Sequence, residues 1–154
     1  MILDKHAVED EFFQGIQAPC IWLDHHKVQH PPSKVTYINP RKIAEDNNYP
    51  TSYLAYLISK ENAWIAVTGI VSDWELPDKQ LWETIEEEIP GFLSKEIKTA
   101  PEALYNSPAG RIARIFSFAQ KGYNSTSMTH LKILTRIKHP KELLEEEHAQ
   151  ARLI

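Results

Sequence analysis

The chain of 154 residues lacks the features that mark several protein classes. Its single cysteine, Cys20, has no partner within the chain, which excludes a disulfide scaffold. No apolar run approaches the roughly 20 residues that a membrane-spanning helix needs. The chain has 17 Lys and Arg against 21 Asp and Glu, which gives a net charge of −4. This charge argues against a protein whose whole surface is basic and binds phosphate groups. The lone cysteine, with no signal peptide, predicts a reducing cytoplasm.

Two short apolar runs each end in an aspartate. Residues 1–3 lead into Asp4, and residues 20–23 lead into Asp24. Between them, residues 8–16 have the spacing of a short amphipathic helix. Two strands joined by a helix are parallel, so both aspartates are expected at one edge of a sheet, where α/β proteins bind ligands.

The residues that follow the second run form a cluster of chemically active side chains. Asp24, His25 and His26 are consecutive. Carboxylate and imidazole ligands together suit Mn²⁺, Fe²⁺ or Zn²⁺. Histidine is also the side chain best placed to move a proton near neutral pH. The alternative is a loop in which the histidines cap backbone carbonyls.

A third strand is expected at residues 35–38, where β-branched and aromatic residues are frequent. It ends at an Asn-Pro turn dipeptide followed by Arg41. The guanidinium of Arg41 is suited to bidentate phosphate binding. A surface arginine without a ligand is the alternative.

The middle of the chain contains two apolar segments. Residues 50–58 predict a helix opened by a proline in its first turn. Residues 64–71 are apolar on almost every side. Periodicity alone therefore cannot distinguish a helix from a strand here, and we favour a helix. Asp73 follows this segment, where a helix C-terminus disfavours a negative charge. A bound cation would offset that cost, and an exposed loop carboxylate is the alternative.

The second half of the chain is more charged and predicts helices at 78–89, 111–119, 127–137 and 141–153. The cations Arg111, Arg114 and Lys121 could reach a nucleic-acid backbone or simply cover a surface helix. The predicted fold class is therefore α/β, with a small, mostly parallel sheet and a helical C-terminal half.

Several of these motifs, taken in order, resemble the DHH phosphoesterase superfamily, and most closely its archaeal-type RecJ-like members. Asp4, the run Asp24-His25-His26 and Asp73 occur in the order of that family's metal motifs. The stretches that carry the resemblance are LDKHAVEDEFF, IWLDHH, YINPR, YPTSYLAY and WIAVTGIVSD. The likeness covers roughly the first 75 residues and continues weakly into the helices beyond. It implies a partial DHH domain over residues 1–121 and a helical extension over 122–154.

The resemblance implies metal-dependent phosphodiester hydrolysis on single-stranded DNA, RNA or short oligonucleotides. The family uses a two-metal site, usually manganese, with magnesium as the alternative. By resemblance Asp4 would bridge both metals, and His25 and Asp73 would bind one of them. Asp24 would orient neighbouring ligands, and His26 would face the scissile phosphate.

The sequence also departs from the family pattern. The family's earlier strand, with a His-x-x-x-Asp-x-Asp motif, has no counterpart here, and neither does the glycine-rich substrate domain that commonly follows. We therefore expect an N-terminally truncated catalytic domain with little or no activity alone. One alternative is a subunit of a split phosphoesterase, with a second chain supplying the missing motif. The other is a non-catalytic interaction module that binds a partner through Tyr53, Tyr56 and the C-terminal helices.

Overall fold

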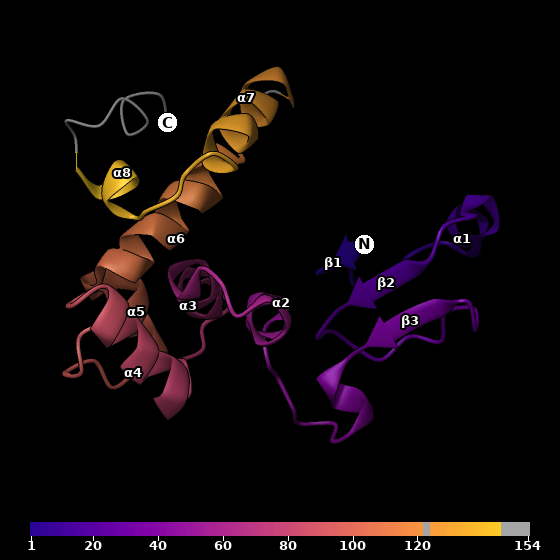
Figure 1. The fold of residues 1–154 in the computed structure, drawn as a ribbon, viewed down its shortest axis with the longest axis horizontal. Helices are drawn as coiled ribbons and strands as arrows, with labels where there is room; N and C mark the ends of the chain where they lie inside the picture. The colour runs from indigo at the N-terminus through magenta and orange to yellow at the C-terminus, as the bar shows by residue number, and fades with distance from the viewer. Residues whose placement is uncertain (122–123, 146–154) are drawn as a thin grey trace. The chain divides into compact units, whose positions relative to one another are not determined.

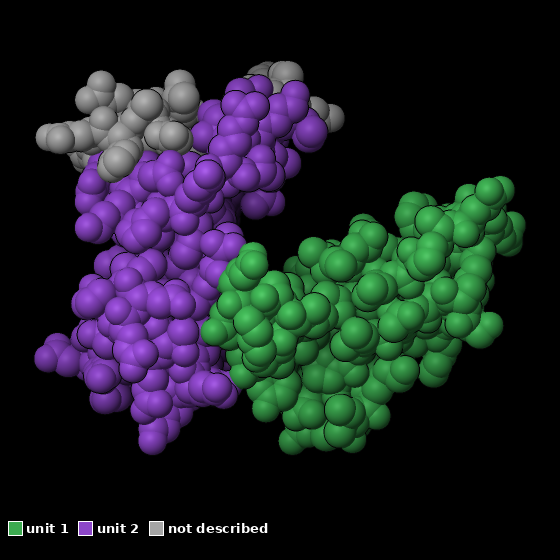
Figure 2. Space-filling view, in the orientation of Figure 1, with its two compact units in different colours: residues 1–61 green, residues 62–154 purple. Residues whose placement is uncertain are grey.

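The computed structural model describes residues 1–121 and 124–145 of the chain. These residues form two compact units, residues 1–61 and residues 62–154 (Figure 2). The predicted α/β class with a helical C-terminal half is confirmed. The domain boundary that the resemblance implies at residue 121 stays a prediction.

The first unit is built on a three-stranded parallel sheet in the order β1-β2-β3 (Figure 1). The strands are β1 (Ile2–Leu3), β2 (Cys20–Leu23) and β3 (Val35–Ile38). Leu3 pairs with Leu23, which pairs with Ile38 on its other side. All three strands therefore end at one level, and the residues that follow them share one edge of the sheet.

The helix α1 (Asp10–Gly15) lies between β1 and β2 in the chain, as the sequence predicts. Its Phe13 is 1% exposed and packs with Trp22, Cys20 and Val35 in one core cluster. The indole Nε1–H of Trp22 also donates to the backbone oxygen of Lys5 at 3.1 Å. This bond ties the segment after β1 to the central strand.

After β3 the chain forms a 3₁₀ turn (Pro40–Lys42) and then α2 (Thr51–Ser59). The side chain of Asn39 caps the turn by accepting a hydrogen bond from the backbone N–H of Arg41 at 2.9 Å. The helix α2 packs against β2 and brings its first residue to the carboxyl end of the sheet.

The second unit is helical in its described part. Its helices are α3 (Ala63–Ser72), α4 (Lys79–Glu88), α5 (Ala100–Asn106), α6 (Pro108–Ala119), α7 (Asn124–Leu134) and α8 (Lys141–Leu144). The segment that periodicity left open is the helix α3, which packs against α4, α5 and α6. Its Val67 and Val71 are fully buried, as are Ile85 of α4 and Ile112 of α6. Because α3 is buried on nearly all sides, its apolar residues are not confined to one face of the helix, and the sequence shows no helical periodicity.

Three predictions for the second unit need adjustment. The helix expected at 127–137 begins and ends earlier, as α7. The helix expected at 141–153 ends in the structure at Leu144, with Glu145 as an extended C-cap, and residues 146–154 lie outside the described part. The helix α5 has no counterpart among the predicted elements.

The start of α5 is fixed by a capping box between Thr99 and Glu102. The carboxylate of Glu102 accepts hydrogen bonds from the backbone N–H groups of Lys98 and Thr99, at 2.8 and 3.2 Å. The bond from Lys98 is the largest cause that holds the pKa of Glu102 below its ordinary value of 4.5. The ionised carboxylate therefore contributes to stability above that ordinary value, and the contribution is lost as the pH falls through the lowered pKa.

The helices α5 and α6 approach each other so closely at Gly110 that no side chain fits. A Cβ atom there would overlap the backbone carbonyl groups of Ala103 and Leu104. Because the obstacle is backbone, we expect Gly110→Ala to reduce the free energy of unfolding by about 3 kcal/mol, at the upper end of the overpacking range. Urea denaturation checks this. Gly15→Ala is the control, because nothing lies within 4 Å of its added Cβ, and an equal loss there would contradict the explanation.

No helix in residues 1–121 and 124–145 combines the length and the apolar character that crossing a membrane requires.

Candidate metal centre

The candidate site is assembled by the ends of the three parallel strands. Asp4 follows β1, Asp24 follows β2 and Asn39 follows β3. The sheet ladder continues into these residues: the N–H of Asp4 donates to the oxygen of Leu23 at 3.0 Å, and that of Asp24 to the oxygen of Ile38 at 3.1 Å. The register of the strands therefore sets the relative positions of these polar side chains.

Asp4 is held in an uncommon backbone conformation. Its φ is +54°, in the left-handed region that few residues other than glycine, asparagine and aspartate adopt. The hydroxyl of Thr51, the first residue of α2, donates to Asp4 Oδ1 at 2.8 Å. Thr51 is only 4% exposed, so this donor is fixed by packing. Backbone conformation and hydrogen bond together aim the Asp4 carboxylate into the site.

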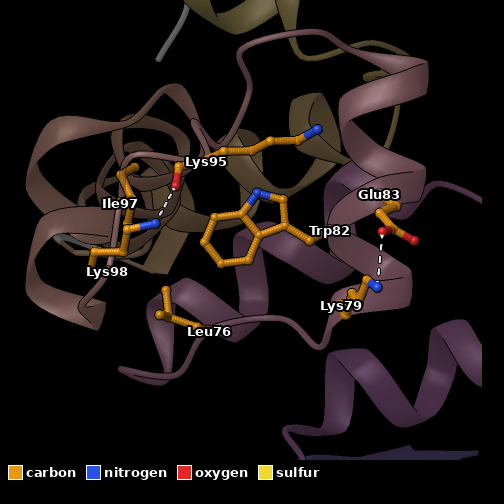
Figure 3. A pocket seen from close by; sticks show the side chains of 7 residues that line it. All are labelled: Leu76, Lys79, Trp82, Glu83, Lys95, Ile97 and Lys98. Carbon is orange, nitrogen blue, oxygen red and sulfur yellow. Dashed lines mark hydrogen bonds and ion pairs between the residues drawn. The ribbon is translucent and has the colours of Figure 1, made fainter.

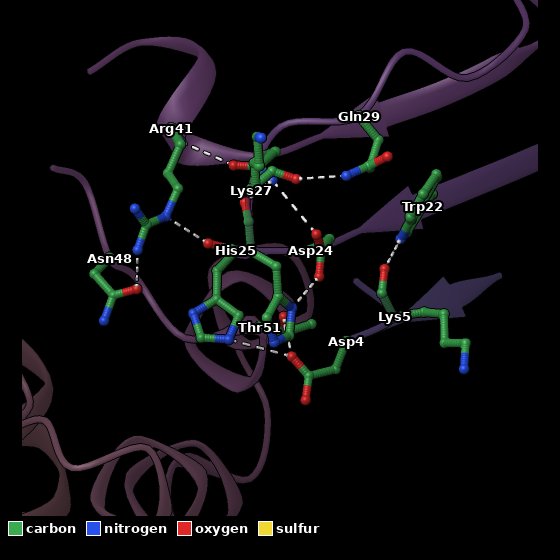
Figure 4. Close-up of polar contacts among 12 residues, drawn as sticks. Asp4, Lys5, Trp22, Asp24, His25, Lys27, Gln29, Arg41, Asn48 and Thr51 are labelled. Atoms are coloured by element: carbon green, nitrogen blue, oxygen red, sulfur yellow. Dashed lines mark hydrogen bonds and ion pairs between the residues drawn. The ribbon is translucent and has the colours of Figure 1, made fainter. Parts of the chain in front are cut away.

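His25 and His26 complete a cluster with Asp4; Figure 4 shows His25 beside Asp4. One ligand atom from each of the three residues lies within 4.8 Å of the others. His25 Nε2 lies 3.4 Å from Asp4 Oδ1, and His25 is 8% exposed. The two imidazole rings have centroids 4.6 Å apart. The structure therefore brings together three of the residues that the sequence singled out.

The buried carboxylate of Asp24 orients His26. Asp24 is fully buried, and its Oδ1 lies 2.7 Å from His26 Nδ1. When Nδ1 carries the proton, Nε2 offers its lone pair to an external partner. Asn39 Nδ2 donates to the backbone oxygen of His26 at 3.0 Å, which fixes the main chain of the same residue. The side chain of His26 is 42% exposed and so remains open to a ligand.

Arg41 contacts the protein's own loops. Its Nε–H donates to the backbone oxygen of His25 at 2.7 Å (Figure 4). Its two terminal nitrogens donate to the oxygen of Glu45 at 3.0 Å and to Asn48 Oδ1 at 2.9 Å. The guanidinium thereby clamps the loop that carries His25. Phosphate binding through its other N–H groups stays a prediction.

Asp73 belongs to the second unit, where it is the C-terminal cap of α3. Its backbone N–H donates to the oxygens of Gly69 and Ile70 at 3.0 and 3.1 Å, and the residue is exposed. The cluster described in the first unit does not include it. Its role as a metal ligand stays a prediction.

Three further residues that sequence reasoning did not assign to the site contribute to it. Thr51 and Asn39 supply the hydrogen bonds described above, and His6 lies with its ring centroid 6.1 Å from that of His26. Asn39 had a local signal, because it follows a strand, as Asp4 and Asp24 do. Thr51 had no such local signal, because it lies 47 residues along the chain from Asp4, to which it donates.

The donor set fits a divalent transition metal. Two imidazole nitrogens and one carboxylate oxygen are ligands that suit Mn²⁺, Fe²⁺ and Zn²⁺. The ligand atoms lie within 4.8 Å of one another, and two ligands at about 2.1 Å from one ion are at most about 4.2 Å apart, so a bound ion would draw the most widely spaced atoms closer together. The partners that orient ligands in metal sites are also present, as Asp24 beside His26 and Thr51 beside Asp4.

Comparisons of the chain with family models, with curated proteins and with solved structures find no match.

Proposed function

We propose that the first unit holds a divalent metal ion, preferentially Mn²⁺, for phosphodiester hydrolysis on single-stranded nucleic acid or short oligonucleotides. The observation that supports the proposal is the convergence of Asp4, His25 and His26 at the carboxyl edge of a parallel sheet. The resemblance of the same residues to the DHH motifs supports the reaction class. The metal, the substrate class and a cytoplasmic location are all part of this proposal.

Each residue of the cluster has a separate task in the proposed reaction. Asp4 and His25 bind the cation through one oxygen and one nitrogen. A divalent cation there supplies Lewis-acid chemistry, which polarises a phosphoryl oxygen and lowers the pKa of water. His26, held at Nδ1 by Asp24, is the third ligand of the cation in the free site and turns Nε2 toward the phosphate once a substrate is bound, where it can donate or accept a proton.

The described cluster offers three ligand residues, fewer than a two-metal site requires. In the proposal the other ligands come from a second chain that carries the His-x-x-x-Asp-x-Asp motif, and a metal-binding role of Asp73 stays what the resemblance implies. This chain by itself is then a weak catalyst, adequate only for a phosphodiester with a good leaving group.

An activated substrate tests this proposal. With Mn²⁺, the full chain is expected to release p-nitrophenol slowly from bis(p-nitrophenyl) phosphate, whose leaving group needs no assistance, and to leave a labelled 12-mer oligonucleotide uncut. His25→Ala and Asp4→Asn are expected to remove the activity, because each removes a ligand of the cation. His30→Ala is the control, since His30 is an exposed loop residue outside the cluster.

The two alternatives predict different results. Oligonucleotide cleavage by this chain alone would show that no second chain is needed. A folded chain with no Mn²⁺-dependent hydrolysis would contradict the proposal and favour an interaction module that uses Tyr53 and Tyr56, which are half-buried on α2.

A further inference from the structure

The second unit contains a pocket of about 500 Å³ that none of the residues in the metal centre lines. Its volume is in the range of small-molecule sites. The pocket is lined by one tryptophan, two aliphatic residues, three lysines and one glutamate: Trp82, Leu76, Ile97, Lys79, Lys95, Lys98 and Glu83 (Figure 3). An aromatic surface surrounded by cations is an unusual composition in a chain with a net charge of −4.

Trp82 forms the aromatic surface of this pocket. The residue lies on α4 and is half-buried. Its Nε1–H donates to the backbone oxygen of Leu93 at 3.0 Å, which fixes the plane of the indole. Leu76 and Ile97 lie around the ring (Figure 3). A planar ligand can therefore stack on a ring that is already oriented, at a low cost in conformational entropy.

The three lysines give the pocket its positive charge. All three are exposed, and Lys98 Nζ donates to the backbone oxygen of Lys95 at 2.8 Å. Lys79 lies 3.8 Å from Glu83, with side chains 88% and 58% exposed. Such an exposed pair is weak, so Lys79 can exchange this partner for a ligand anion.

The loop that carries two of these lysines is anchored to the next helix. The backbone N–H of Lys98 donates to the carboxylate of Glu102 in the capping box of α5. The N–H of Ile97 donates to the oxygen of Ser94 at 3.1 Å, which closes a turn in the same loop. The cations are thus carried on a backbone with a defined position beside Trp82.

We propose that this pocket binds single-stranded nucleic acid, with one base stacked on Trp82 and the adjoining phosphates at Lys79, Lys95 and Lys98. Stacking on aromatic residues beside a cationic surface is the general mode of single-strand binding. A duplex cannot use it, because its bases are already stacked on one another. An acidic peptide would satisfy the lysines and leave the indole without a planar partner. The inference rests on the proposed function for its substrate class.

Fluorescence anisotropy with a labelled dT12 oligonucleotide tests the stacking. The full chain is titrated in EDTA at low salt. Trp82→Leu is expected to weaken binding at least about tenfold, because it removes the stacking surface, whereas Trp82→Phe should stay within about threefold of the parent chain. Circular dichroism melts establish that each variant is folded.

The salt dependence tests the lysines. Each of Lys79→Gln and Lys95→Gln is expected to lower the slope of log K against log salt by about 0.7, the value for one phosphate contact with a single strand. Lys132→Gln and Lys138→Gln are the matched controls, because both residues are exposed and lie outside the pocket. Their slopes should equal that of the parent chain.

Three results would overturn the proposal. The first is an unchanged affinity for dT12 in a folded Trp82→Leu variant. The second is an affinity for a duplex of the same length that equals the affinity for dT12. The third is displacement of labelled dT12 by poly-glutamate as effectively as by unlabelled dT12. If Trp82→Leu fails to fold, the lysine variants decide, because unchanged slopes in Lys79→Gln and Lys95→Gln would overturn the proposal. Because EDTA removes divalent metal, the outcome is independent of Mn²⁺ binding and of the proposed hydrolysis.

Discussion

Calorimetric titration of Mn²⁺ into the full chain is expected to show binding in the micromolar range that His25→Ala weakens by more than about 100-fold. Loss of an orienting partner costs about 10–100-fold in metal affinity, and loss of a ligand should exceed that. His25 is 8% exposed with Nε2 3.4 Å from Asp4 Oδ1, and its truncation leaves only Asp4 and His26 in the cluster.

The control for this titration is His30→Ala, which removes an imidazole from an exposed loop position. Its affinity for Mn²⁺ should match that of the parent chain. Electron paramagnetic resonance of Mn²⁺ provides a readout that does not depend on catalysis. Equal affinities in the parent chain and a folded His25→Ala variant would show that the cluster is not the binding site.

Asp24→Asn is expected to lower Mn²⁺ affinity by about 10–100-fold in a chain that still folds. The substitution keeps the size of the side chain, and the amide oxygen can still accept the bond from His26 Nδ1. The lost charge, however, makes the imidazole a weaker ligand. The second oxygen of Asp24, which accepts from Asn39 Nδ2 at 3.5 Å, becomes a buried NH2 donor in the variant, so some stability is lost as well.

Asp46→Asn is the matched control, because Asp46 is exposed in the loop before α2 and lies outside the cluster. It removes the same charge from the chain and should leave Mn²⁺ affinity unchanged. A fall in melting temperature for Asp24→Asn, with unaltered Mn²⁺ affinity, would instead give Asp24 a purely structural role.

The strands of the first unit could be predicted because their signals are local. Each is a short apolar run that ends at a polar residue, and the chain order strand-helix-strand implies parallel pairing. The same reasoning placed Asp4 and Asp24 at one edge of the sheet, which the register confirms. The helix α3 was less certain, since burial on all sides removes the periodicity that separates helix from strand.

The parts of the site that sequence reasoning missed depend on contacts between distant residues. Thr51 reaches Asp4 only because α2 packs on β2, and a threonine at a helix start ordinarily has a local role. The position of Arg41 after β3 was clear, but the direction of its guanidinium was set by loops containing Glu45 and Asn48. The pocket around Trp82 combines α4 with residues 95–98, and no spacing in the sequence signals that combination.

Burial of Cys20 makes the first unit separately observable. It is the only cysteine of the chain, it is 6% exposed, and it lies in the core of the unit that contains the metal cluster. A thiol reagent can reach Cys20 only when that core opens. The labelling rate therefore measures the opening equilibrium of this unit and does not depend on opening of the second unit. Slower labelling in the presence of Mn²⁺ would then report metal binding as protection of this unit.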